Sequence, residues 1–395
     1  MIRNVLIVHN SYLHLGGEDS VVNNEQKLLS KYGIKTDFYH KNNSEINRFS
    51  TLVTAINTRY SYRSKKDFRK FLSKLRPDIV HVHNFFPLLS PSIYDACIEE
   101  KVAVVQTLHN YRTVCPGALL TRNGEICENC LKGSPYQSVI YGCYRNSRLA
   151  TLAVANMVAY HKRKRTWNNK VDCFIALTKF AKMKFIEAGF PENNISVKPN
   201  FVWDNLSQNQ PLSIDKERKK NALFVGRLSK EKGVMTLLKS WEEVQIDLQI
   251  VGAGPLDLNA LVDKGKFVHF LGQLDGSSVL KLMKESAFLV MPSEWYEGFP
   301  MVLVEAFSQG LPVVGSRLGS MAEIIQDGVT GLHFEAGNAA DLAEKVRWMD
   351  EHPNEREQMG RNARKVYEEN YTPEKNYQIL MGIYQKAVES NRGVG

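Results

Sequence analysis

The sequence lacks any apolar run long enough to cross a membrane. Its longest apolar stretches have the length of a β-strand, whereas a spanning helix needs about 20 apolar residues. We also expect no secretory leader, because residues 1–9 have the pattern of a strand rather than a charged region followed by an apolar one. We therefore expect a cytoplasmic protein.

Cysteine is scarce, with six residues in 395. Inside a cell these are expected to be thiols or metal ligands rather than disulfides. Four of them lie in the Gly- and polar-rich segment 111–148 with the spacing C-x11-C-x2-C-x12-C: Cys115, Cys127, Cys130 and Cys143. The central spacing lets two thiolates bind one tetrahedral ion. The segment, which should bury little by itself, is thus either a structural zinc site or a long loop with ordinary thiols.

Acidic residues are scarce in the first half of the chain. Residues 1–200 hold 29 Lys and Arg against 15 Asp and Glu, a net charge of +14, and the remainder holds 22 against 27, or −5, which together give +9. The first half should therefore meet an anionic partner. No nucleic-acid recognition motif appears, so nucleic acid is not expected. The basic runs at 59–66 and 161–165, beside aromatic or apolar residues, favour an anionic membrane surface at the inner face of the cell membrane. The alternative is a core helix with a solvated charged end.

Strands and helices alternate in both halves, and a polar linker at 203–220 separates them. This pattern predicts two α/β domains, each with a doubly wound parallel sheet. We place the first domain at 1–200, the second at 201–373 and a last helix at 374–395.

The stretch 288–316 has the strongest pattern in the chain. A buried strand at 288–291 is followed by a loop, a helix from Met301 to Gln309 and a second strand. Glu297 precedes this helix and Glu305 lies within it, where the other residues are nearly all apolar. A buried carboxylate needs a cation or hydrogen-bond donors. Alternatively, Glu297 only favours the helix dipole, by about 0.3–1 kcal/mol, and Glu305 is a satisfied structural group.

The start of the same helix is a candidate anion site. Pro300 suits a first helical position, and the N–H groups of Phe299, Met301 and Val302, next to Gly298, have no partner within the helix.

Three further groups are candidates for ligand contact. The first is a glycine turn after the first strand, the second is a basic strand-to-helix connection, and the third is a pair of histidines at predicted strand ends, where doubly wound folds bind ligands. Each has a plainer interpretation as a tight turn, solvated charges or structural histidines. They are Gly16 and Gly17, Arg227 and Lys232, and His83 and His109.

E-G-F-P-M-V-L-V-E at 297–305 resembles the E-x7-E motif of retaining glycosyltransferases of family 4, or group 1, and G-R-L-S-K-E-K-G at 226–233 is also similar to that family. The resemblance covers almost the whole chain. It implies a GT-B fold, in which two Rossmann-like domains face each other across a cleft and a C-terminal helix crosses back to the first domain. It also implies that Glu297 contacts the donor sugar and that Glu305 holds the ribose.

The resemblance assigns roles to the other candidates. Arg227 and Lys232 would neutralise the donor diphosphate, Gly16 and Gly17 would face it, and His109 would contact the sugar, with His83 in support. The implied reaction is transfer of a hexose or N-acetylhexosamine, with retention, from a nucleotide-diphosphate sugar to a glycan or lipid-linked acceptor in bacterial surface polysaccharide or glycolipid synthesis.

UDP is favoured over GDP as the nucleotide of the donor. No cofactor is expected for catalysis, because the sequence contains no D-x-D motif for a divalent metal. Two alternatives remain: a nucleotide-sugar isomerase on the same fold, and a glycoside hydrolase that uses the two carboxylates.

Overall fold

The computed structural model describes residues 2–11, 16–45, 50–204, 218–256 and 266–392. The chain forms two compact units, which are described separately. The first unit comprises Met1–Arg122, Cys127–Pro199 and Asn376–Gly395, and the second comprises Asn123–Ile126 and Asn200–Lys375.

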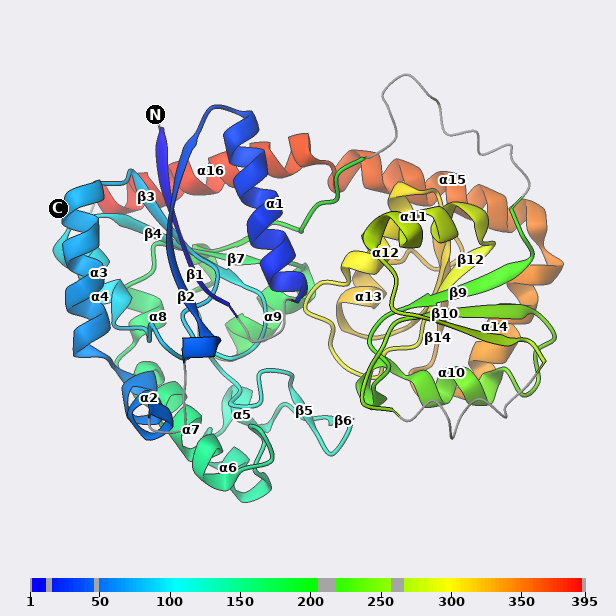
Figure 1. The fold of residues 1–395 in the computed structure, drawn as a ribbon, viewed down its shortest axis with the longest axis horizontal. Coiled ribbons are helices and arrows are strands. Elements are labelled where there is room, and N and C mark those ends of the chain that lie inside the picture. Colours follow the sequence, from blue (N-terminus) through cyan, green and yellow to red (C-terminus); the bar gives the residue numbers. More distant parts are fainter. Residues whose placement is uncertain (1, 12–15, 46–49, 205–217, 257–265, 393–395) are drawn as a thin grey trace. The chain divides into compact units, whose positions relative to one another are not determined.

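The first unit is built on a six-stranded parallel sheet with the order β2-β1-β3-β4-β7-β8 (Figure 1). The chain passes from β1 to β2 on one side and then returns to β3 on the other, so the order of the sheet reverses between β1 and β3. Ligands of doubly wound folds bind beyond the carboxyl ends of the strands at such a point. The strands are β1 (Asn4–Ser11), β2 (Lys35–Asn42), β3 (Ile79–Val82), β4 (Ala103–Leu108), β7 (Cys173–Ala176) and β8 (Ile195–Val197).

Helices connect these strands, and several begin at a residue whose hydroxyl caps the helix. Ser61, Ser147 and Thr178 each accept a hydrogen bond from the backbone N–H three residues later. The helix that carries the start of the basic run 161–165 ends at Arg163, and Arg165, with a left-handed backbone at φ of +51°, separates it from a second short helix. The helices are α1 (Gly17–Lys31), α2 (Ser50–Arg59), α3 (Tyr62–Leu75), α4 (Ile93–Glu99), α7 (Arg148–Arg163), α8 (Thr166–Asn169), α9 (Lys179–Glu187) and α16 (Pro373–Arg392).

The part of α16 from Asn376 onward belongs to the first unit. Tyr384 is fully buried there, and its hydroxyl lies 2.8 Å from Nδ1 of His81 in β3. Tyr377 stacks on Tyr32 with ring centroids 3.7 Å apart.

The cysteine-containing segment contributes more to the core than its composition predicted. It holds short elements: β5 (Thr121–Arg122), β6 (Glu125–Ile126), α5 (Asn129–Lys132) and α6 (Gln137–Tyr141). The expectation that it would bury little was wrong, because its few apolar side chains pack inward and Tyr111 stacks on Phe185. The buried apolar residues are Tyr111, Val114, Cys115, Ala118, Leu120 and Leu131.

The second unit also contains a six-stranded parallel sheet, with the order β11-β10-β9-β12-β13-β14 (Figure 1). Its order reverses between β9 and β12. The strands are β9 (Asn221–Val225), β10 (Asp247–Val251), β11 (Val268–Gly272), β12 (Phe288–Met291), β13 (Val313–Ser316) and β14 (Gly331–Phe334). The helices are α10 (Val234–Ser240), α11 (Gly276–Glu285), α12 (Met301–Ser308), α13 (Gly319–Ile324), α14 (Ala339–Glu351) and α15 (Pro353–Asn370), with a 3₁₀ turn η3 at Lys230–Lys232.

The stretch 288–316 folds as predicted into β12, a loop, α12 and β13. Helix α12 is less buried than expected, since Met301 and Val302 at its start and Glu305 are half-buried. Its other face packs into an apolar cluster that includes Leu303, Phe307 and Tyr367 of α15. Within the described residues, no helix is long and apolar enough to cross a membrane.

Candidate functional site

The loops that follow β9 and β12 carry the candidate site of the second unit. Glu297 is 6% exposed, and its Oε1 accepts hydrogen bonds from Lys232 Nζ at 2.6 Å and Ser293 Oγ at 2.7 Å. The hydroxyl of Ser320 donates to the carbonyl of Glu297 at 2.6 Å. Oε2 has no protein partner among the described residues. The carboxylate is therefore fixed in position while one oxygen remains available to accept a hydrogen bond from a ligand.

Gly233 allows these two loops to approach closely. Its φ is +68°, and a Cβ there would lie 1.8 Å from the carbonyl oxygen of Pro292. Beside this contact, the N–H of Glu294 donates to the carbonyl of Glu231 at 2.9 Å. The backbone contact explains how Lys232, from the first loop, reaches Glu297 on the second.

The two predicted phosphate-binding cations have different surroundings. The Lys232 side chain is 24% exposed and its ammonium lies 5.5 Å from the centre of the Trp295 ring. The Arg227 side chain is 58% exposed and pairs with Glu231 of the same turn. Lys232 is thus held at the site by Glu297, whereas Arg227 would have to leave Glu231 to meet a phosphate.

Glu305 differs from Glu297 because its carboxylate has no protein partner among the described residues. Burial raises its pKa, and no neighbouring charge opposes this effect. A desolvated carboxylate without donors is costly. The sequence-based expectation that Glu305 needs hydrogen-bond donors is therefore not met by the described protein residues.

Unpartnered amides surround the start of α12. The first hydrogen bond of the helix runs from the N–H of Leu303 to the carbonyl of Pro300. No protein group in the described parts of the chain accepts a hydrogen bond from the N–H of Gly298, Phe299, Met301 or Val302. Helix-start amides of this kind bind anions such as phosphate.

In the first unit, histidines gather at the carboxyl ends of β1, β3 and β4. His109 Nε2 lies 2.9 Å from His83 Nδ1, and the His9 ring meets the His83 ring edge-on. Beneath them, Glu25 of α1 is 1% exposed and pairs with Lys198 at 3.0 Å. The structure thus joins His109 and His83, which the sequence only placed at neighbouring strand ends.

The predicted glycine turn is less open than expected. The N–H of Gly16 donates to Asp19 Oδ2 at 2.9 Å, so this amide is already used. A Cβ at Gly16 or Gly17 would meet nothing within 4 Å, so the protein itself imposes no steric need for glycine. Next to the turn, burial and the negative charge of Asp19 raise the pKa of Glu18 to about 8, although Arg112 opposes the shift. The role of both glycines at a diphosphate stays a prediction.

The four cysteines of segment 111–148 lie in the first unit as free thiols. Cys115 and Cys143 flank Gly117, with atoms 3.7 Å and 3.6 Å from the place that a Cβ would occupy. Burial raises the pKa of Cys130 to about 12, and the other three thiols add to the shift. Zinc binding stays a prediction, and the zinc content of the purified protein would test it.

One histidine–carboxylate group in the described residues has ligand atoms within 4.8 Å of one another: Glu25, His81 and His83. Glu25 Oε1 lies 2.8 Å from His81 Nδ1 and 3.2 Å from His83 Nε2. The ammonium of Lys198, 3.0 Å from Oε2, already neutralises the carboxylate, and His81 Nδ1 pairs with the hydroxyl of Tyr384. We therefore interpret the group as a charge-compensated cluster of buried side chains.

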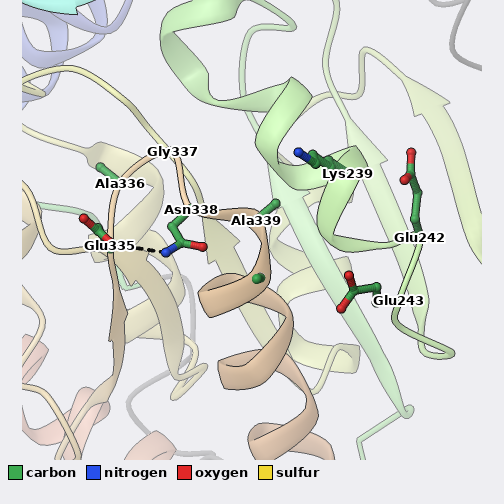
Figure 2. Close-up of a pocket in the computed structure, with 9 residues that line it drawn as sticks. Lys239, Glu242, Glu243, Glu335, Ala336, Gly337, Asn338 and Ala339 are labelled. Atoms are coloured by element: carbon green, nitrogen blue, oxygen red, sulfur yellow. Dashed lines mark hydrogen bonds between the residues drawn. The ribbon is translucent and has the colours of Figure 1, made fainter.

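A surface hollow of about 620 Å³ lies elsewhere in the second unit, between the end of α10 and the loop before α14. Figure 2 shows Glu242 and Glu243 on one side and Glu335, bonded to Asn338, on the other. None of the predicted site residues lines it, and its carboxylates would repel a diphosphate.

Several residues of these sites were missed by the sequence interpretation. Ser293 and Ser320 fix Glu297, and Glu25 and Lys198 underlie the histidines. Ser293 lies two residues after a predicted strand, which was a usable signal. Glu25 and Lys198 are 173 positions apart, so no local spacing could pair them.

Comparison with known families decides the identity. Residues 42–204 match the model described as "Glycosyltransferase Family 4", and residues 208–366 match "Glycosyl transferases group 1". The two matches are consecutive and cover most of both halves of the chain. The chain belongs to the family 4, group 1 glycosyltransferases.

Individual relatives are distant. The glycosyltransferase is 24% identical over 332 residues to a 42.6 kDa protein in the cps region of Klebsiella pneumoniae. This alignment covers 81% of this chain and 82% of that protein. It is 34% identical over 156 residues, or 38% of this chain and 41% of the relative, to the D-rhamnosyltransferase WbpZ of Pseudomonas aeruginosa. The chain spans about half the length of several other curated relatives that it matches.

Solved structures confirm the predicted fold class. Anabaena Alr3699/HepE in complex with UDP superimposes with a TM-score of 0.67 at 17% identity, covering 97% of this chain and all of that one. Another structure of that protein is in complex with UDP-glucose. The two parallel doubly wound sheets are thus those of a GT-B glycosyltransferase.

Proposed function

We propose that this glycosyltransferase moves a sugar, with retention, from a nucleotide-diphosphate sugar to a glycan or lipid-linked acceptor in the synthesis of a bacterial surface polysaccharide or glycolipid. UDP is the favoured nucleotide, a choice supported by the complexes of Alr3699/HepE with UDP and UDP-glucose.

The observation that carries the proposal is the contrast between the two carboxylates of one loop–helix turn. Glu297 is fixed by Lys232 and Ser293 and offers one oxygen, whereas Glu305 is desolvated without a protein donor. Sugar and ribose hydroxyls are the donors that both groups lack. We assign Glu297 to the transferred sugar and Glu305 to the ribose.

The leaving diphosphate is the main charge to be stabilised in such a transfer. The unpartnered backbone amides at the start of α12, those of Gly298, Phe299, Met301 and Val302, supply fixed donors. Lys232, which is hydrogen-bonded to Glu297 just before this helix, supplies positive charge. Donors held in place before reaction need no reorganisation when charge develops. Arg227 is a second cation that could join once its pairing with Glu231 is broken.

In the first unit, we assign His109 to a hydroxyl of the transferred sugar.

The first unit also carries the surface assigned to an anionic membrane and a lipid-linked acceptor. This surface is formed by α2, α6 and α7, where basic and apolar side chains are exposed together. Flotation of the protein with anionic vesicles, but not with neutral ones, would test membrane contact. The exposed residues include Leu52, Ile56, Ile140, Leu149, Arg145 and Arg148.

Nucleotide binding tests the proposed function through Glu305→Ala. We expect UDP at 100 times its dissociation constant to stabilise the wild-type protein by about 2.7 kcal/mol, and to do so more than GDP at the same concentration. The variant should lose most of this stabilisation. Thermal shift with UDP, GDP and their sugars measures both effects.

The apo protein provides an internal check on the same variant. Burial raises the pKa of Glu305 in the folded state above its value in the unfolded chain. The folded protein therefore loses stability as the pH rises from the unfolded-state pKa to the folded-state pKa of this residue. Glu305→Ala should therefore be at least as stable as wild type at pH 7 without nucleotide, apart from the lost packing. Glu344→Ala, an exposed change on α14, is the matched control and should respond to UDP like the wild type. Equal stabilisation of Glu305→Ala by UDP would refute the assignment.

A further inference from the structure

Two buried side chains, Glu25 of α1 and His83, lead to His109. The carboxylate of Glu25 lies 3.2 Å from Nε2 of His83, and Nδ1 of His83 lies 2.9 Å from Nε2 of His109. Nε2 of His83 and Oε1 of Glu25 are both buried, and neither forms a well-aligned hydrogen bond within the described residues. A negative carboxylate at this distance disfavours a bare lone pair on Nε2 and favours a proton there.

The charge of Glu25 is held by Lys198. Its ammonium lies 3.0 Å from Glu25 Oε2 and 3.2 Å from Asn376 Oδ1, and all three residues are buried. Burial alone would raise the pKa of Glu25, but Lys198 and the two nearby histidines lower it well below its usual value. Glu25 is therefore an ionised carboxylate that can only accept hydrogen bonds.

His83 is neutral and carries one proton. Burial lowers its pKa to about 3, and the neighbouring His81 adds to this effect. A neutral imidazole donates from one nitrogen and accepts at the other. Because Glu25 only accepts, the proton of His83 sits on Nε2 and its Nδ1 carries a bare lone pair. That lone pair can accept only from a protonated Nε2 of His109.

His81 lies beside the same carboxylate oxygen without reversing this order. Its Nδ1 is 2.8 Å from Glu25 Oε1 but forms its hydrogen bond with the hydroxyl of Tyr384, also at 2.8 Å. Its Nε2 lies 2.8 Å from the hydroxyl of Thr107. Both nitrogens of His81 therefore have hydrogen-bond partners other than Glu25.

We propose that Glu25, acting through His83, fixes His109 in the tautomer that presents a bare Nδ1 to the substrate. His109 is half-buried, and its Nδ1 has no partner among the described residues. A bare imidazole nitrogen accepts a hydrogen bond from a hydroxyl and cannot donate to a phosphate oxygen. The inference rests on the proposed function in naming a sugar hydroxyl as the ligand. Glu25 and His83 are positioning residues, since they act only through His109.

Nitrogen-15 NMR of the protein labelled at histidine tests the tautomer without any substrate. In the wild-type protein between about pH 6 and 8, the signal of His109 Nε2 should be that of a protonated nitrogen and the signal of Nδ1 that of a bare one. His109→Gln, which lacks these signals, assigns them. A protonated Nδ1 in the wild-type protein would overturn the proposal, whatever the activity.

Two variants at His83 separate positioning from packing. In His83→Phe the acceptor for His109 is gone, so both tautomers should appear and kcat/KM for the nucleotide sugar should fall about tenfold, the effect of roughly one hydrogen bond. In His83→Asn the amide oxygen can replace Nδ1 as acceptor, so the bare Nδ1 signal should return together with most of kcat/KM. A single unchanged tautomer in folded His83→Phe would contradict the inference.

The two readouts distinguish failure of this inference from failure of the proposed function. The expected tautomer in a protein that transfers no sugar would refute the proposed function alone. Sugar transfer by a protein with the opposite tautomer would refute the positioning role alone.

Discussion

Replacing Glu297 by glutamine should lower the turnover of a nucleotide sugar by about 100-fold or more, the usual effect of removing one fixed electrostatic group at a reacting centre. The substitution keeps the shape of the side chain but removes the charge that holds Lys232 at 2.6 Å. It therefore disturbs both the group assigned to the sugar and the cation assigned to the diphosphate. Release of UDP from the nucleotide sugar, measured with and without acceptor, gives kcat and KM.

The neighbouring Glu294 provides a control on the same loop. Its carboxylate accepts a hydrogen bond from Thr236 Oγ1 at 2.5 Å and has no contact with Lys232 among the hydrogen bonds and ion pairs of the described residues. Glu294→Gln should change turnover only a few-fold, roughly the effect of one neutral hydrogen bond. UDP should still bind to Glu297→Gln, because the ribose contact is assigned to Glu305. Unchanged turnover in Glu297→Gln would refute its role.

Gly233→Ala should cause a large loss of stability in the second unit. The added Cβ would lie 1.8 Å from the carbonyl oxygen of Pro292, a backbone atom that cannot move alone, and the residue has φ of +68°. We expect a loss of more than 4 kcal/mol in the free energy of unfolding, a size found only where a specific packing mechanism acts. Urea unfolding measures this loss. Nucleotide binding should weaken as well, because the two loops that join Lys232 to Glu297 are forced apart.

Gly328→Ala separates backbone conformation from steric contact. Gly328 has a similar φ of +73°, but a Cβ there would meet nothing within 4 Å. It should cost only about 1–2 kcal/mol, the usual penalty of a left-handed non-glycine residue. Equal losses in the two variants would show that the contact with Pro292 does not decide the stability of Gly233→Ala.

The local structure around α12 followed from the sequence because its signals are local. An apolar run of strand length, a proline at the helix start and a glycine after its end predicted β12, α12 and β13 within one or two residues. Local signals did not indicate the break at Arg165, where a non-glycine residue adopts a left-handed backbone between two helices. They also underestimated the burial of segment 111–148, because burial depends on which surface a side chain meets.

The residue types of the candidate sites were also readable, but their partners were not. The sequence pointed to Glu297 before a helix, Lys232 in a strand-to-helix connection and His109 at a strand end as separate candidates. It assigned Lys232 to a phosphate and not to Glu297, 65 positions away, although the two form a hydrogen bond in the fold. It left His83 as a supporting residue without showing what it supports.

The sequence by itself determined that this protein has two doubly wound α/β halves and a pair of glutamates on one loop–helix turn, because strand length, helix caps and residue spacing are properties of neighbouring residues. Only the tertiary structure decided which carboxylate is fixed, which is left without a donor, and how Glu25 reaches His109 through His83. Charges and hydrogen bonds depend on distances of a few ångströms, and folding sets these distances between residues that are far apart in the chain.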